Sequence, residues 1–232
     1  MNAHASSESG HAEALLLPLL ALDPRLPGVW AWVQAHMTPD AAHDDAHLAR
    51  VGVWTRRCAP DVPAALAVAA ALTHDVVNLP KNHPQRAQAS TLAAQAAQAA
   101  LPDLGFTPAD AHEVALAVRD HSFSRGARPE TRLGAALQDA DRLDALGALG
   151  VLRVASVGGR MGRALLHPLD PWAQDRAPDD LAFTVDHFFS KLLRLHESFQ
   201  TEAGRAEAQR RTAFMHAFLR QLGAETGQPY SG

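Results

Sequence analysis

The sequence has one cysteine, only two lysines and no clustered excess of positive charge, and these shortages already narrow the class of protein. A single thiol, Cys58, cannot form an intrachain disulfide, so we expect a reducing compartment, and the cytoplasm is the simplest one. The formal net charge is -4, whereas nucleic-acid-binding proteins carry a basic patch or stripe. We therefore expect no nucleic-acid partner.

Long apolar segments are missing as well. The first apolar run covers residues 14–22, but it is short, contains Pro18 and has no Lys or Arg before it, unlike a secretory signal or a membrane span. We expect no membrane partner. The composition is otherwise that of a globular protein, because 47% of the 232 residues are hydrophobic and this length suffices for one substantial core.

The hydrophobic spacing follows helical periods, and no segment shows the alternation typical of a strand. We predict an all-α fold, with a single compact domain over residues 11–225, about nine or ten helices, and flexible tails at 1–10 and 226–232. Thr107, Pro108 and Asp110 predict the capped start of a helix that runs to about residue 121. A leucine series predicts one helical stretch over 132–153, and prolines and glycines predict an irregular surface region over 158–180. The other predicted helices cover residues 13–22, 29–37, 44–55, 64–75, 87–101, 185–200 and 202–225.

The most informative pair of residues, His74 and Asp75, lies in the stretch from Val68 to Asn82. The pair stands at the C-terminal end of a nearly all-apolar helix, which favours a central position for that helix. Ionisable groups in such a place require partners or a cation, since an isolated buried charge is very costly. Pro80 prevents the helix from simply continuing.

Two further blocks supply histidine and aspartate at a distance along the chain. His43 and His47 stand upstream, one helical turn apart, and Asp139 and Asp141 stand downstream. Because Asp139 and Asp141 point to different sides of a helix, we expect only one of them to bind a given ion. Two imidazoles and two carboxylates that converge would form an open site for Mn, Mg, Co, Ni or Fe rather than a closed structural zinc site.

Five motifs occur in order along the chain: Thr-His74-Asp75-Val-Val, Lys81-Asn-His-Pro-Gln-Arg86, His121-Ser-Phe-Ser, Gln138-Asp-Ala-Asp141-Arg-Leu-Asp144 and Asp186-His-Phe…Lys191. In these motifs the chain resembles the HD-domain metal-dependent phosphohydrolases, and a small bacterial branch of them in particular. The resemblance implies the compact HD-domain helical fold, a divalent metal, with Mn preferred, and hydrolysis of phosphate esters or anhydrides. It points toward nucleotide pyrophosphohydrolases, and hence toward a phosphorylated small molecule, a nucleotide, as the substrate.

The resemblance also implies a set of metal ligands, namely His47, His74, Asp75 and Asp141. His47 is preferred to His43 because the family's first histidine directly precedes a helix of the Leu-x-Arg-Val type. His43 is then a hydrogen-bonding neighbour of the site or an exposed histidine, and direct ligation of the metal in place of His47 is a third alternative.

The chain departs from the family after the His-Asp pair. Many HD nucleotidases carry an acidic residue a few positions later for proton transfer, but the sequence here reads Val-Val-Asn over residues 76–78. The catalytic candidates are therefore His121 and Asp144. We rank His121 first, because imidazole titrates near neutral pH, while the alternative interpretation is a histidine that caps its helix through the carbonyls.

Phosphate groups require cations, and we expect Lys81, Arg86 and Lys191 to bind them through charge-assisted hydrogen bonds. For each of the three, a solvated surface charge is an equally good interpretation. A homodimer also stays open, because the apolar helix over 185–195 would serve as core or as a dimer surface.

Three other functions compete with pyrophosphate release. The nearest is a nucleotide phosphomonoesterase. A di-iron, oxygen-activating protein would need further histidines between the His-Asp pair and the last aspartate; of His83, His112 and His121, only His121 lies in a matching motif, so we predict one metal. The third is a regulatory module that binds nucleotides without turnover.

Overall fold

The computed structural model describes residues 14–37, 45–79, 85–122 and 125–232. Within these ranges the regular structure is helical, and the only β-pairing is an isolated bridge between Ala164 and Phe183. The predicted all-α fold is therefore confirmed. Searched over the same ranges, the chain contains no helix that combines the length and the apolar character needed to cross a membrane.

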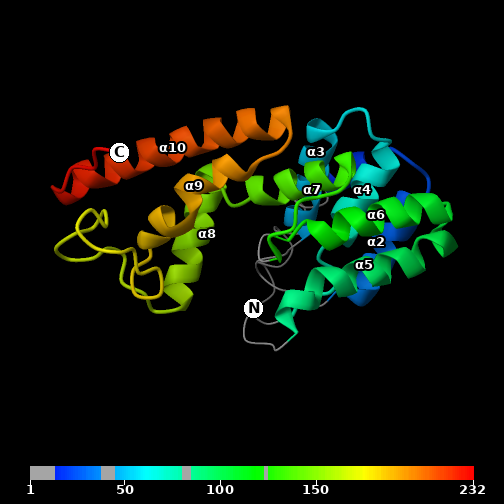
Figure 1. The fold of residues 1–232 in the computed structure, drawn as a ribbon, viewed down its shortest axis with the longest axis horizontal. Helices are drawn as coiled ribbons and strands as arrows, with labels where there is room; N and C mark the ends of the chain where they lie inside the picture. The colour runs from blue at the N-terminus through cyan, green and yellow to red at the C-terminus, as the bar shows by residue number, and fades with distance from the viewer. Residues whose placement is uncertain (1–13, 38–44, 80–84, 123–124) are drawn as a thin grey trace. The chain divides into compact units, whose positions relative to one another are not determined.

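The chain divides into two compact units, residues 1–141 and 142–232 (Figure 1). The prediction of a single domain over 11–225 remains a prediction. The first unit contains the helical residues 14–20 and most of α7 (Arg132–Leu143), together with α2 Leu26–His36, α3 Asp45–Cys58, α4 Ala64–Thr73, η1 Arg86–Gln88, α5 Ala89–Ala100, η2 Pro102–Leu104 and α6 Pro108–Asp120. The second unit contains α8 Gly147–Arg160, the short turns η4 Phe188–Leu192, α9 Leu193–Leu195 and η5 His196–Ser198, and α10 Glu202–Thr226.

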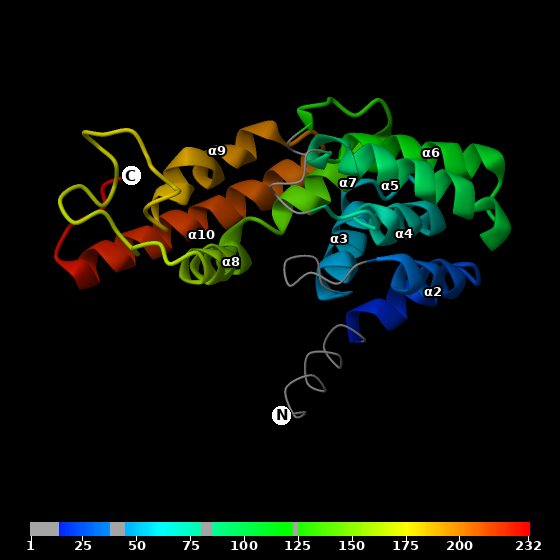
Figure 2. The same ribbon diagram turned by 90° about the horizontal axis from the view of Figure 1, so that it is seen from below.

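Helix α4 lies at the centre of the first unit. Every residue from 65 to 73 is buried, and Ala67, Ala69 and Leu72 have no exposed surface. Helices α2, α3 and α6 pack against α4, and Figure 2 shows α2 and α5 on either side of it. Small side chains allow this close approach of neighbouring helices. The predicted central position of the helix is confirmed, although the helix ends at Thr73, two residues earlier than predicted.

Helix α6 begins with a capping box, as the sequence predicts. The Thr107 hydroxyl accepts a hydrogen bond from the backbone N–H of Asp110 at 3.1 Å, and the Asp110 carboxylate accepts one from the N–H of Thr107 at 3.2 Å. Pro108 occupies the first helical position, where its missing N–H costs nothing. These contacts fix the start of the helix that leads to His121.

The prediction of one helical stretch over 132–153 is wrong, because the chain turns between α7 and α8. Gly147 has a φ of +73°, which side chains with a Cβ rarely adopt, and a Cβ there would lie 3.1 Å from Cγ of Arg211. The hydrophobic spacing could not reveal the break. Leu143 and Leu146 are both fully buried and keep a helical separation across the turn.

Helices α8 and α10 pack against each other in the second unit. A Cβ on Gly150 would overlap the Ala145 carbonyl oxygen and would lie 3.3 Å from Cε of Met215 on α10, so the chain before α8 leaves no room for a side chain here. The predicted helix over 185–200 is instead a succession of a π-helical turn, one α-helical turn and a 3-10 turn.

The irregular region predicted from residue 158 starts only after Arg160, and a buried carboxylate ties it to the rest of the second unit. Asp186 accepts hydrogen bonds from the Arg176 guanidinium and from the backbone N–H of Asp179, the latter at 2.6 Å. The residues after α10 also contact this region, since the Trp172 indole donates to the Gln228 carbonyl at 2.9 Å. The predicted flexibility of the two tails remains a prediction, and residues 1–10 lie outside the described residues.

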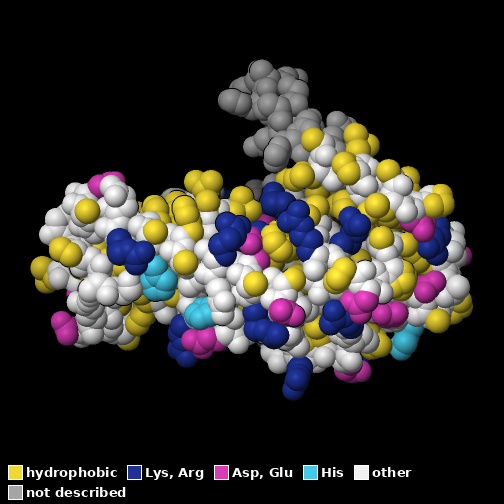
Figure 3. Space-filling view, turned by 90° about the horizontal axis from the view of Figure 1, so that it is seen from above, with side chains coloured by type: hydrophobic (Ala, Val, Ile, Leu, Met, Phe, Trp, Pro, Cys, Tyr) yellow, Lys and Arg dark blue, Asp and Glu magenta, His cyan; other side chains and the backbone are white. Residues whose placement is uncertain are grey.

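The face of the molecule drawn in Figure 3 carries charges of both signs. Basic side chains (dark blue) are interspersed there with acidic ones (magenta) and with apolar ones (yellow). Large exposed apolar side chains of the second unit include Leu152, Leu169 and Leu181. Isolated exposed leucines are ordinary on a globular surface, so the predicted homodimer remains a prediction.

Candidate metal centre

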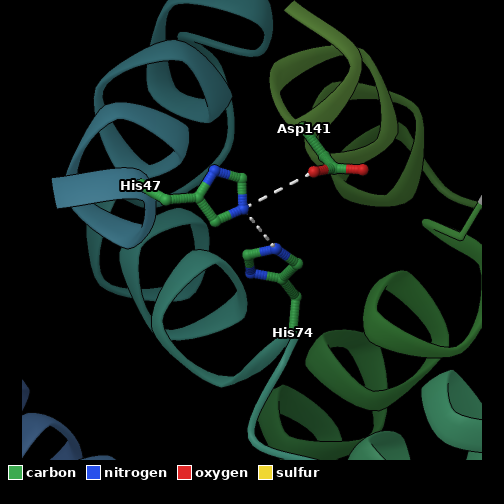
Figure 4. Close-up of side chains that lie close together, drawn as sticks. All are labelled: His47, His74 and Asp141. Carbon is green, nitrogen blue, oxygen red and sulfur yellow. Dashed lines mark hydrogen bonds and ion pairs between the residues drawn. The ribbon is translucent and has the colours of Figure 1, made fainter. Parts of the chain in front are cut away.

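Three helices of the first unit bring His47, His74 and Asp141 together (Figure 4). The Nε2 atom of His47, on α3, lies 3.3 Å from Nε2 of His74 and 3.6 Å from an Oδ of Asp141. Both rings are buried, while the Asp141 side chain is 28% exposed. The site is thus closed by helices around the imidazoles and accessible at the carboxylate.

The sequence of α3 explains why His47 points inward. Leu48, Val51 and Thr55 follow it at spacings that share one side of a helix, and all three have no exposed surface. The Thr55 hydroxyl donates to the Val51 carbonyl at 2.8 Å, which leaves no unpaired polar atom of this threonine in the core. The buried side of the helix therefore carries the imidazole with it.

His74 and Asp75 occupy the turn that follows α4. Nδ1 of His74 donates to the Ala71 carbonyl at 2.7 Å, so Nε2 is the nitrogen that faces the site. That Nε2 atom lies 3.3 Å from Oδ2 of Asp75. Burial alone would lower the pKa of His74, but the carboxylates of Asp75 and Asp141 outweigh burial and raise that pKa to about 9.

The two carboxylate oxygens of Asp75 face different histidines. Oδ2 faces His74 and lies 3.9 Å from Nε2 of His47, whereas Oδ1 lies 3.6 Å from Nε2 of His121. Burial favours the neutral acid, but the His74 imidazolium and the hydrogen bonds from His121 and His74 prevail and hold the pKa of Asp75 well below its usual range. The carboxylate is therefore ionised at neutral pH.

His121 follows the last residue of α6 and is 4% exposed. Its Nδ1 donates to the Val118 carbonyl at 2.7 Å, as the capping interpretation of the sequence expects, and its Nε2 faces Asp75. His74, Asp75 and His121 thereby form a second group that could hold a metal. The sequence predicts an acid or base at His121, but not its place beside the His-Asp pair.

The spacing of these atoms fits a divalent ion. Ligand atoms at about 2.1 Å from a six-coordinate ion lie about 3 Å apart when adjacent and about 4 Å apart when opposite. In the first group, Nε2 of His47 lies 3.3 Å from His74 and 3.6 Å from Asp141. In the second, Asp75 lies 3.3 Å from His74 and 3.6 Å from His121, and all ligand atoms of a group lie within 4.8 Å of one another. Buried imidazoles whose Nδ1 is already bonded to a carbonyl present the other nitrogen in the way metal sites require.

Only one of the two aspartates of α7 joins a metal-binding group, as their spacing on a helix predicts. Asp141 lies in the first group, whereas Asp139 is fully buried and lies in neither group of the described residues. The alternative first ligand, His43, lies outside the described residues, as does His83. His112 is on α6, where Nδ1 lies 3.5 Å from the Gln98 amide, and it joins neither group.

None of the remaining predicted site residues that the structure describes belongs to either group. Asp144 belongs to the second unit, is 3% exposed and accepts a hydrogen bond from Arg153 at 2.8 Å. Lys191 lies in η4 of the same unit and is partly buried. Lys81 lies outside the described residues, and only the backbone of Arg86, in η1, is described.

Comparison with known proteins identifies the family of the chain. The family model of the HD domain matches residues 45–146, the span that holds all five histidines and aspartates of the two groups. The chain belongs to the HD-domain superfamily of metal-dependent phosphohydrolases.

Among individual relatives, the uncharacterized protein YpgQ of Bacillus subtilis is 32% identical over 198 residues, which cover 82% of this chain and 88% of YpgQ. The crystal structure of YpgQ in complex with ADP is similar with a TM-score of 0.68 and 28% identity, covering 87% of this chain and 95% of that one. An HD-superfamily hydrolase of Bacillus thuringiensis is similar with a TM-score of 0.65 and 27% identity, covering 87% and 96% of the two chains.

Proposed function

We propose that this protein hydrolyses phosphate bonds of nucleotides with a divalent metal, and that its main reaction converts a nucleoside triphosphate and water into the monophosphate and pyrophosphate. The observation that carries the proposal is the convergence of His47, His74 and Asp141 with Asp75, an N/O donor set with open positions. Such a set suits catalysis better than a closed structural site does.

Four residues would hold the ion: His47, His74, Asp75 and Asp141. When bound, the metal lowers the pKa of a coordinated water and stabilises negative charge on a phosphoryl oxygen. Imidazole and carboxylate ligands together suit Mn, Mg, Co, Ni and Fe. Among these metals Mn is preferred, because the resemblance to the HD-domain phosphohydrolases favours it. The exposed edge of Asp141 leaves the phosphate a way to approach.

His121 is the preferred residue for proton transfer. Its Nδ1 is engaged by the Val118 carbonyl, so the proton that it accepts or returns is the one on Nε2, beside Asp75. Asp144 is the weaker candidate, because its carboxylate already accepts a hydrogen bond from Arg153.

A nucleotide substrate is supported by the ADP in the crystal structure of YpgQ. In the favoured reaction water attacks the α-phosphorus, the bond from that atom to the α,β-bridging oxygen breaks, and pyrophosphate leaves with that oxygen. We propose that Lys81, Arg86 and Lys191 bind the phosphate oxygens that carry this charge.

The products test this proposal. Metal-stripped protein reloaded with Mn is incubated with a mixture of nucleoside triphosphates, and the products are resolved by phosphorus NMR. We expect pyrophosphate from the wild type, none from Asp141→Asn, and an unchanged amount from Asp61→Asn, whose exposed carboxylate pairs with Arg132. Orthophosphate alone would instead support a phosphomonoesterase, and the absence of both products with every divalent ion would contradict the proposal.

A second candidate function rests on the second group, His74, Asp75 and His121, since Asp75 directs one oxygen to each group. Two irons held in this way would support oxygen activation. Counting bound iron per chain and recording the visible spectrum tests it: two irons with a charge-transfer band support it, and one metal or fewer excludes it.

A further inference from the structure

One side chain of α7, Gln138, forms hydrogen bonds with the backbone just before His121 and with the backbone six residues after it. Its amide group donates to the Asp120 carbonyl at 2.8 Å and to the Ala127 carbonyl at 3.1 Å. An amide carries two hydrogens, so a single group serves both carbonyls. Gln138 is 1% exposed, and water therefore has little access to replace these bonds.

The side chain of Asp120 is fastened separately. The Arg119 guanidinium donates to its two oxygens at 2.8 and 2.7 Å and donates to Glu130 at 2.6 Å. Asp120 is 2% exposed, and Arg125 lies 3.7 Å from it. These ion pairs satisfy the buried carboxylate beside His121. They leave the backbone carbonyl of Asp120 to Gln138.

Gln138 shares its side of α7 with a residue of the metal centre. Gln138 and Asp141 are three residues apart and are neighbours on the helix surface. Gly134, four residues earlier, continues this side, and a Cβ there would lie 3.0 Å from Cβ of Pro129. Helix α7 therefore packs closely against the chain at Pro129. One side of α7 carries both the aspartate of the first group and the amide that holds the histidine of the second.

We propose that Gln138 is a positioning residue, which holds the backbone of His121 so that the imidazole faces Asp75. The hydrogen bond to the Val118 carbonyl sets the rotation of the His121 ring. Gln138 instead fixes the position of the backbone that carries this ring. The inference rests on the proposed function in so far as His121 takes part in that reaction. The apolar, nearly isosteric substitution Gln138→Met removes both hydrogen bonds and keeps the volume.

The first test compares Gln138→Met with Gln221→Met, the same change at an exposed position of α10 where the amide donates to Glu225. With the nucleotide that wild type hydrolyses, we expect kcat of Gln138→Met to fall at least about tenfold and KM to stay within about twofold, because a misplaced acid–base group affects the transition state more than substrate binding. Gln221→Met keeps both constants. A kcat within twofold of wild type in Gln138→Met would overturn the proposal.

A double-mutant cycle shows whether Gln138 acts through His121. In a His121→Ala background we expect Gln138→Met to change kcat by less than about twofold, since the group that it positions is gone. An equal loss in both backgrounds would mean a general structural role and would overturn the proposal. Leu219→Ala on α10 serves as a control that lowers thermal stability without this coupling.

A third measurement does not depend on the substrate. Ring resonances of His121 in metal-free, 15N-histidine-labelled protein are assigned from their loss in His121→Ala. We expect Gln138→Met to shift or split them and to leave those of His196 unchanged, whereas an unshifted His121 ring would overturn the proposal. If wild type hydrolyses no nucleotide, the proposed function fails, yet this spectrum still decides the role of Gln138. Should Gln138→Met not fold by circular dichroism, Gln138→Asn, which is too short to span both carbonyls, replaces it in each arm.

Discussion

Histidines with the same local hydrogen bond stand in both units of the molecule, but they have different surroundings. In the first unit, Nδ1 of His74 and of His121 donates to the carbonyl three residues earlier, at 2.7 Å in each case. In the second unit, Nδ1 of His196 does the same with Leu193 at 2.8 Å. The bond satisfies a carbonyl at a helix end and requires no ligand.

The difference lies at the other ring nitrogen. Nε2 of His74 and of His121 faces Asp75, at 3.3 and 3.6 Å, whereas His196 belongs to no metal-binding group within the part of the chain that the structure describes. The backbone contact orients a ring, but the opposing carboxylate makes a cation site. A histidine at a helix end is therefore informative only together with an acidic partner.

Removal of His74 should have the largest effect on metal binding and activity. In His74→Ala we expect the affinity for Mn and kcat/KM each to fall by more than about a hundredfold, because even a hydrogen-bonding partner of a metal ligand is worth 10- to 100-fold. Metal content by mass spectrometry and steady-state kinetics measure both. A variant that keeps its metal and its rate within twofold would show that His74 is no ligand.

Neutralising Asp75 should have a smaller effect. Asp75→Asn keeps an oxygen that can still bind the ion weakly, so we expect the Mn affinity to fall about tenfold to a hundredfold. Asp180→Asn is the matched control, since Asp180 pairs with His187 at 2.6 Å in the second unit. Equal losses of affinity in the two variants, measured by competition with a chelating dye, would contradict a specific role for Asp75.

Metal binding at His74 should also depend on pH. Burial by itself lowers the pKa of His74, but the carboxylates of Asp75 and Asp141 raise it to about 9. Below that pH the ring holds a proton that must leave before Nε2 can bind a metal. We therefore expect the Mn affinity to rise about tenfold per pH unit between pH 6.5 and 9, in chelator competition. An affinity that is independent of pH over this range would contradict the assignment.

The same raised pKa predicts the stability of the metal-free protein. Protonated His74 contributes stability that is fully present below its unfolded pKa of about 6.5 and is lost as the pH rises through about 9. The Tm of metal-free protein should therefore fall across this interval. Metal-loaded protein, whose ligand is already deprotonated, should show no such fall.

Removal of His196 should have the smallest effect. His196→Ala loses one hydrogen bond to the Leu193 carbonyl, and we expect kcat/KM and Mn affinity to stay within about twofold of wild type. Steady-state kinetics and chelator competition check both constants. A loss as large as that of His74→Ala would show that the local bond, rather than the acidic partner, defines the functional histidines.

The sequence predicted those features that local chemistry determines. The capped start of α6 follows from Thr107, Pro108 and Asp110, and the burial of α4 follows from its alanines and leucines. The period of a helix also predicts that only one of Asp139 and Asp141 joins a metal-binding group, whereas the choice of Asp141 rests on the family resemblance. The catalytic and ligand roles remain predictions, because geometry alone measures no reaction.

Features that depend on distant parts of the chain could not be predicted. The turn between α7 and α8 depends on a positive φ at Gly147 and on the Arg211 side chain, 64 positions later in the chain. The place of His121 beside Asp75 depends on how α6 packs against α4. The hydrogen bond from Arg153 to Asp144 could not be predicted either, because the hydrophobic period joined α7 and α8 into one helix.

Helix α4 also limits how this protein can change over generations. Its residues 65–73 are buried, so a larger side chain finds no room and a polar one finds no water. In a saturation library, the surviving substitutions there should be few and small, whereas the exposed positions of α10 should tolerate most amino acids. The helix that precedes His74 and Asp75 should therefore accept only a few small amino acids. Most substitutions that the protein tolerates should fall at exposed positions.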